Sequence, residues 1–94
     1  MDIARSDIVK STAGRDKGKY FFVLGVEEDF LLLADGKTRK LEAPKRKKRK
    51  HVQFAARCDC RAAEKIRSEE RITNSELRRA LAAFGGEGNP DQEG

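Results

Sequence analysis

The feature that most constrains the fold of this chain is the segment 7–26, which reads DIVKSTAGRDKGKYFFVLGV. It consists of an apolar stretch, a short turn bounded by Gly14 and Gly18, and a second stretch rich in β-branched and aromatic residues. Glycine at both ends lets the backbone take positive φ angles, so the segment predicts a β-hairpin with a tight tip. The tip carries three cations that are candidates for contact with a phosphate chain: Arg15, Lys17 and Lys19.

Short apolar segments separated by turn residues predict that this hairpin belongs to a small antiparallel β-barrel. The expected strands are residues 7–12, 20–27, 30–34, 37–41 and 51–55. Ile8 and Val9 should point to opposite faces of the first strand, and Gly25 permits a bulge in the second. Asp35-Gly36 is typical of a two-residue hairpin turn, so it is expected to join the third and fourth strands directly.

Helical spacing replaces the strand pattern after residue 57. A short helix is expected around residues 62–66, and Thr73 with Glu76 forms a capping box at the start of a longer helix. The longer helix carries an apolar stripe made of Leu77, Ala80, Leu81 and Phe84. Gly85-Gly86 should end it, and a polar segment follows. The predicted organisation is a barrel over residues 1–57, a helical extension over 58–84 and a disordered tail over 85–94.

Positive charge is concentrated in one part of the chain. Residues 37–51 carry 9 basic and 1 acidic side chains, a balance of +8, whereas the net charge of all 94 residues is +5. The basic run consists of six consecutive cations: Lys45, Arg46, Lys47, Lys48, Arg49 and Lys50. Mutual repulsion should keep this run extended and loosely packed, so replacing its lysines should leave the fold intact. A polyanion is the expected partner; a solubilising loop and a nuclear import signal are the alternatives.

A strand followed by Gly14, Lys17-Gly18-Lys19 and a second apolar strand resembles the KOW motif of ribosomal and transcription-elongation proteins. With the basic run and the closing ITNSELRRAL, residues 3–84 look like the small bacterial KOW-domain RNA-binding proteins. Those proteins are similar to archaeal and eukaryotic large-subunit ribosomal KOW proteins. In one departure, Phe21 and Phe22 stand where the motif often has a further glycine. The resemblance implies an SH3-like barrel that binds ribosomal RNA and acts in translation.

The sequence gives little support to metal binding or catalysis. Cys58, Cys60 and His51 supply three of the four ligands that structural zinc needs, so the favoured role of both cysteines is half-buried filler. The GxSxG, P-loop and HExxH patterns do not occur, and we expect neither an enzyme nor a cofactor. The sequence has no apolar run of signal-peptide or membrane-span length. A monomeric cytoplasmic protein is therefore expected.

Two functions fit these features. The first is a non-catalytic RNA-binding module that presents the glycine turn and the basic run to structured RNA, with affinity from phosphate contacts and selection from RNA shape. Tyr20 and Phe30 are candidates for stacking on an unpaired base, although a small core needs both. The second is a protein-interaction module of the transcription or translation machinery, which docks through the apolar stripe of the C-terminal helix.

Overall fold

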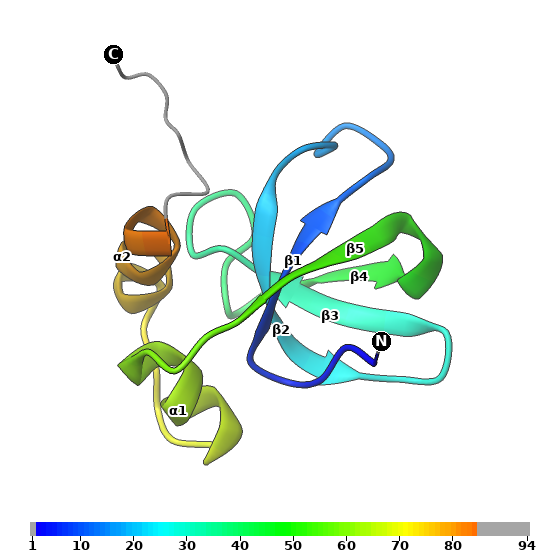
Figure 1. Cartoon of the computed structure of the whole chain (residues 1–94). Helices are drawn as coiled ribbons and strands as arrows, with labels where there is room; N and C mark the ends of the chain where they lie inside the picture. The colour runs from blue at the N-terminus through cyan, green and yellow to red at the C-terminus, as the bar shows by residue number, and fades with distance from the viewer. Residues whose placement is uncertain (1, 85–94) are drawn as a thin grey trace.

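Five antiparallel strands followed by two helices form the part of the chain that the computed structural model describes, residues 2–84 (Figure 1). The strands are β1 (Asp7–Ser11), β2 (Tyr20–Val26), β3 (Phe30–Ala34), β4 (Lys45–Lys48) and β5 (Val52–Arg57). A single 3₁₀ turn, η1 (Arg49–His51), joins β4 to β5, and the helices are α1 (Arg61–Arg67) and α2 (Asn74–Phe84). Neither helix is long and apolar enough to cross a membrane, in the range that the structure covers.

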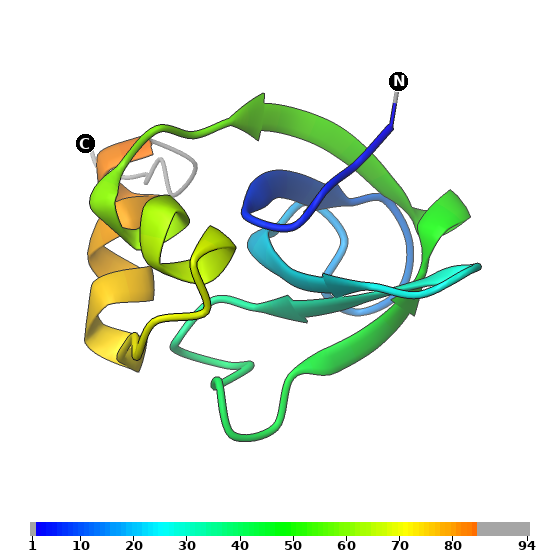
Figure 2. The ribbon, with the colours of Figure 1, turned by 90° about the horizontal axis from the view of Figure 1, so that it is seen from below.

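The strands form one sheet in the order β4-β3-β2-β1-β5. Its two edge strands, β4 and β5, are consecutive in the chain, and Figure 2 shows the sheet curling so that η1 connects its edges. Hydrogen bonds do not close the described sheet into a barrel. The predicted bulge is confirmed, because the β2–β3 register shifts between Val23 and Gly25.

Both faces of β1 and β2 are buried, as the near-continuous apolar character of β2 requires. One face carries an apolar cluster, here called the inner cluster, of Val9, Phe21, Val23, Leu31 and Leu33. The opposite face, with Ile8 and Phe22, packs against the helices through Ala62, Ala63, Ile66, Leu77 and Leu81. The expected division of Ile8 and Val9 between the two faces of β1 is confirmed.

Helix α2 begins with the predicted capping box. The Thr73 backbone N–H donates to Glu76 Oε1 at 2.9 Å, and the Glu76 N–H donates to Thr73 Oγ1 at 3.2 Å. Leu77 and Leu81 of the stripe are buried against the sheet, so burial and capping together fix this helix. The helix reaches Phe84, while the predictions for Gly85-Gly86 and for a disordered tail over 85–94 lie outside the described residues.

The predicted fourth strand over residues 37–41 is wrong, because this segment forms turns and a loop. The Asp35 carboxylate accepts hydrogen bonds from two backbone N–H groups within the turn, which folds the chain away from a strand conformation. Gly36 has a φ of 78°, and a Cβ atom there would overlap the carbonyl oxygen of Asn74 in α2. Arg78 also donates to the Gly36 carbonyl at 2.7 Å. Asp35-Gly36 is thus a docking point for α2 instead of a two-residue hairpin loop.

Candidate nucleic-acid interface

The β1–β2 turn, residues 12–19, has the tight form that its glycines predict. Gly14 and Gly18 have φ angles of 86° and 91°, and the Gly18 N–H donates to the Ser11 carbonyl at 2.7 Å. A Cβ atom at Gly18 would meet nothing within 4 Å, so the left-handed backbone alone explains the need for glycine there. The structure leaves all three predicted contact residues of this turn exposed: Arg15, Lys17 and Lys19.

The basic run is not the loosely packed loop that its charge predicts. Residues 45–48 form β4, an edge strand that pairs with β3, and residues 49–51 form η1. Lys47 stands opposite Leu31 and Lys45 opposite Leu33, so both lysines share the face of the inner cluster. Arg46 and Lys48 point to the other face. Alternation along β4 therefore divides the first four residues of the run into two pairs with different surroundings.

Lys47 is buried, with only 7% of its surface exposed, and its ammonium group makes hydrogen bonds within the protein. Its Nζ donates to Asp16 Oδ1 at 2.9 Å and to the Ala13 carbonyl at 2.8 Å. Ser11 Oγ donates to the same carboxylate oxygen at 2.8 Å, and Lys45 Nζ lies 3.6 Å from Asp16 Oδ2. These contacts reduce the repulsion between Lys45 and Lys47 on this face of β4, because one buried carboxylate contacts both ammonium groups.

The pKa of Asp16 reports on this arrangement. Burial alone raises the pKa, but hydrogen bonds from Lys47 and Ser11, together with the charges of Lys47 and Lys45, outweigh that effect. The result is a pKa lowered from 3.8 to about 2. Asp16 is therefore ionised at neutral pH and ties the β1–β2 turn to β4. The sequence alone does not identify this residue, because Asp16 lies between Arg15 and Lys17 and its partner Lys47 is far away in the chain.

Arg46 is also engaged within the protein. Its Nε donates to Glu27 Oε1 at 2.8 Å, and its guanidinium lies 3.8 Å from the centroid of the Phe30 ring. This cation–π contact occupies a face of Phe30, which removes that face from base stacking. Tyr20 is half-buried, packs against the helix-facing cluster and meets the Phe84 ring edge-on at 5.4 Å. Both aromatic candidates thus have partners inside the protein.

Three cations of the basic run remain outside any ion pair among residues 2–84. Lys48 and Lys50 are exposed and Arg49 is half-buried. The run adjoins the β1–β2 turn directly, since the Thr12 N–H donates to the His51 carbonyl at 2.9 Å and Lys47 reaches the Ala13 carbonyl. The cationic surface, as the term is used below, consists of Arg15, Lys17, Lys19, Lys48, Arg49 and Lys50.

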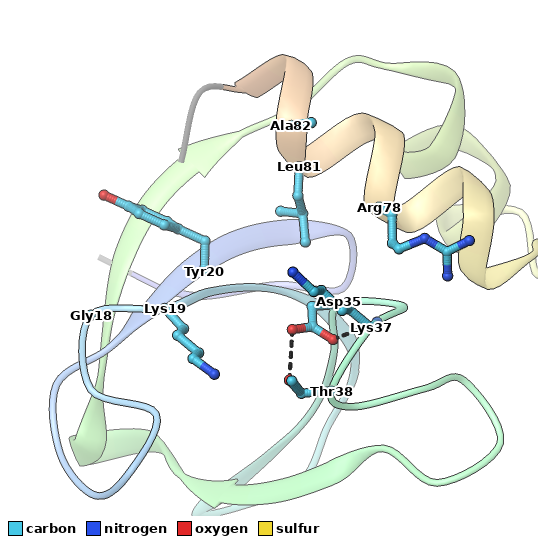
Figure 3. Close-up of a pocket in the computed structure, with 9 residues that line it drawn as sticks. All are labelled: Gly18, Lys19, Tyr20, Asp35, Lys37, Thr38, Arg78, Leu81 and Ala82. Atoms are coloured by element: carbon cyan, nitrogen blue, oxygen red, sulfur yellow. Dashed lines mark hydrogen bonds between the residues drawn. The ribbon is translucent and has the colours of Figure 1, made fainter. Parts of the chain in front are cut away.

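A pocket of about 450 Å³ opens beside this surface (Figure 3). It lies between the end of the β1–β2 turn, the Asp35 turn and helix α2. Its lining includes three cations, Lys19, Lys37 and Arg78, of which the last two were not among the predicted site residues. No local sequence pattern indicates them, because they meet only when α2 docks on the Asp35 turn.

The two cysteines are free thiols and half-buried. Cys58 Sγ accepts a hydrogen bond from the Cys60 N–H at 3.3 Å, and burial raises the pKa of the Cys58 thiol. Within residues 2–84, no group of three or more His, Cys, Asp or Glu side chains is placed to hold a metal ion. The proximity of His51 in the sequence to the cysteines does not produce such a cluster in this region.

No protein-family model matches this chain, and no curated protein matches its sequence. Inference about function therefore depends on the geometry and chemistry of the residues described above.

Proposed function

We propose that this protein is a non-catalytic RNA-binding module that holds structured RNA, with ribosomal RNA as the favoured target, on the cationic surface. The observation that carries the proposal is the direct contact between two cationic segments that lie 26 or more residues apart in the sequence. Lys47 and Thr12 make the contacts that hold the β1–β2 turn against the basic run. The six cations of the cationic surface have no acidic partner in the described region; five of them are exposed and Arg49 is half-buried.

Such a surface suits a phosphate backbone better than base edges. Each neutralised phosphate releases condensed counterions, which supplies affinity without sequence information. Tyr20 and Phe30 both have partners inside the protein, so reading of bases through these two rings is not favoured. Selection would come from RNA shape, since hydrogen bonds through Asp16 and Lys47 hold the turn and the run at a fixed spacing.

The KOW resemblance supports the same proposal and adds detail to it. It favours an SH3-like barrel topology for the curled sheet, a place on the ribosome or in translation, and a cytoplasmic location. The alternative, protein docking through the stripe of α2, needs that stripe to be accessible. Leu77 and Leu81 are 0% and 3% exposed against the sheet, so we do not favour docking through this face.

The test compares Lys17→Gln on the turn, Lys48→Gln on the run, and the double variant, in binding to a structured rRNA fragment over a salt series. Each lost phosphate contact should flatten the plot of log K against log salt by up to about one unit, and the double variant should lose both. Arg71→Gln is the matched control, because Arg71 is an exposed cation on the connection between α1 and α2.

A slope that changes equally in the control would contradict a localised surface. A slope that changes for only one of Lys17 and Lys48 would show that the other segment faces away from the RNA, and the single-surface proposal would fail. Failure to bind the rRNA fragment at any salt concentration would favour a protein partner instead.

A further inference from the structure

The pocket beside the cationic surface combines charge with an apolar wall. Lys19, Lys37 and Arg78 bring three positive charges to it, against one carboxylate, Asp35. That carboxylate is held within its own turn: Oδ1 accepts from two backbone N–H groups at 2.9 Å each, and Oδ2 accepts from Thr38 Oγ1 at 2.9 Å. Figure 3 shows Asp35 turned toward Thr38 within the lining. Three cations against one carboxylate leave the lining with an excess of positive charge, which attracts an anion from outside, even though one N–H of Arg78 already donates to the Gly36 carbonyl.

The apolar wall comes from α2 and the start of β2. Leu81 and Ala82 line the pocket from the helix, and Tyr20 lines it from the strand. A volume of about 450 Å³ falls within the range of pockets that hold small organic ligands, and far exceeds the space that a bare phosphate needs. The pocket thus fits a ligand with an anionic part and a flat apolar part.

We propose that this pocket takes one unpaired nucleotide of the bound RNA. Its phosphate would lie near Lys19, Lys37 and Arg78, and its base against the exposed Ala82 and the accessible part of the half-buried Tyr20. Gly18 and Lys19 belong both to the pocket lining and to the β1–β2 turn, so a strand that crosses the cationic surface passes the pocket mouth. This inference rests on the proposed RNA-binding function and adds to it a preference for RNA with an extruded base.

The test uses two RNA hairpins that differ only by one unpaired adenosine in the stem, with binding measured by fluorescence anisotropy at fixed salt. The wild type should bind the bulged hairpin about tenfold more tightly, the scale expected for one accommodated base. Ala82→Trp should fill the pocket and abolish this preference while leaving affinity for the paired hairpin unchanged. Ala83→Trp is the matched control, since Ala83 is exposed on the same helix but does not line the pocket.

A second pair of variants removes charge without adding bulk. Lys37→Gln should lower the preference for the bulged hairpin, whereas Lys40→Gln, an exposed lysine on the same loop outside the lining, should not. Equal binding of both hairpins by the wild type would overturn the nucleotide inference and leave the RNA-binding proposal standing. Loss of preference in both tryptophan variants would also overturn it, because the effect would not belong to the pocket.

Adenosine monophosphate tests the pocket without RNA. At millimolar concentration it should shift the amide resonances of Lys19, Thr38 and Ala82 in the wild type, and it should leave those of Lys19 and Thr38 unmoved in Ala82→Trp. Shifts by the mononucleotide without any hairpin preference would indicate a site for free nucleotides and would overturn an RNA nucleotide as occupant. If neither hairpin binds the protein, the proposed function fails, and the inference fails with it.

Discussion

Replacing Lys47 by Met should destabilise the protein strongly, although Lys47 belongs to the run that charge repulsion predicts to be dispensable. Methionine keeps an apolar stem of similar length but removes two hydrogen bonds from the ammonium group, to Asp16 and to the Ala13 carbonyl. The carboxylate of Asp16 then stays in a site where its residue is only 9% exposed. The expected effect is therefore the opposite of relief from repulsion.

The energetics of buried ion pairs and the lowered pKa of Asp16 give a similar magnitude for the loss of stability in Lys47→Met. Breaking a buried ion pair by removing one partner costs about 3–5 kcal/mol, and the value here should be lower because Lys45 and Ser11 still contact Asp16. Separately, the fall in the Asp16 pKa from 3.8 to about 2 corresponds to roughly 2 kcal/mol of stabilisation at neutral pH, to which Lys47, Ser11 and Lys45 all contribute. We expect Lys47→Met to lower the free energy of unfolding by about 2–3 kcal/mol, or the melting temperature by roughly 10–20 °C.

The assay is urea unfolding followed by far-ultraviolet circular dichroism at pH 7, since the chain has no Trp. Lys48→Met is the control: it makes the same change one residue further along β4, at an exposed side chain, and should alter stability by no more than about 0.5 kcal/mol. Equal unfolding midpoints for the two variants would refute the assignment of Lys47 to the fold. A double variant, Lys47→Met with Asp16→Asn, should recover part of the loss because no charge stays buried.

Three further predictions concern stability. The stabilisation from ionised Asp16 is complete above about pH 4 and is lost as the pH falls toward 2. The difference in urea midpoint between the wild type and Asp16→Asn should therefore narrow over that interval, and a constant difference would contradict this prediction. Gly36→Ala should lower the free energy of unfolding by more than about 2 kcal/mol and Gly18→Ala by about 1, because both residues have positive φ but only at Gly36 would a Cβ atom overlap α2. Equal melting temperatures of the two variants would disprove the contact with α2. Thr73→Ala should cost about 1 kcal/mol by thermal melting through loss of the capping box, and Ser75→Ala, in the first turn, serves as its control.

Local sequence rules predicted the elements whose causes are local. The glycine turn between β1 and β2, the bulge at Gly25 and the capping box of α2 each depend on a few neighbouring residues, and each is found where the pattern placed it. The strands β1, β2, β3 and β5 were predicted within a few residues of their ends. Apolar alternation and turn chemistry are sufficient for such elements.

Where tertiary contacts decide the structure, the sequence was a poorer guide. The run 45–48 forms a strand because Asp16, 31 residues from Lys47, supplies a buried counter-charge. Residues 37–41 form a loop because α2 packs on the preceding Asp35-Gly36 turn. The pocket cations Lys37 and Arg78 come together for the same reason, so of the candidate site only the exposed turn and run could be anticipated.

The position of β4 at the edge of the sheet has a consequence for self-association. An edge strand carries unpaired backbone groups that can template the addition of a strand from another molecule, and charged side chains are a common protection against this. Here all four residues of the edge strand are cationic. A second copy that paired along β4 would therefore place positive charges opposite positive charges, and they would repel each other. Polyanions neutralise that repulsion, and solutions of this protein should therefore become more prone to edge-to-edge aggregation at substoichiometric RNA than in its absence.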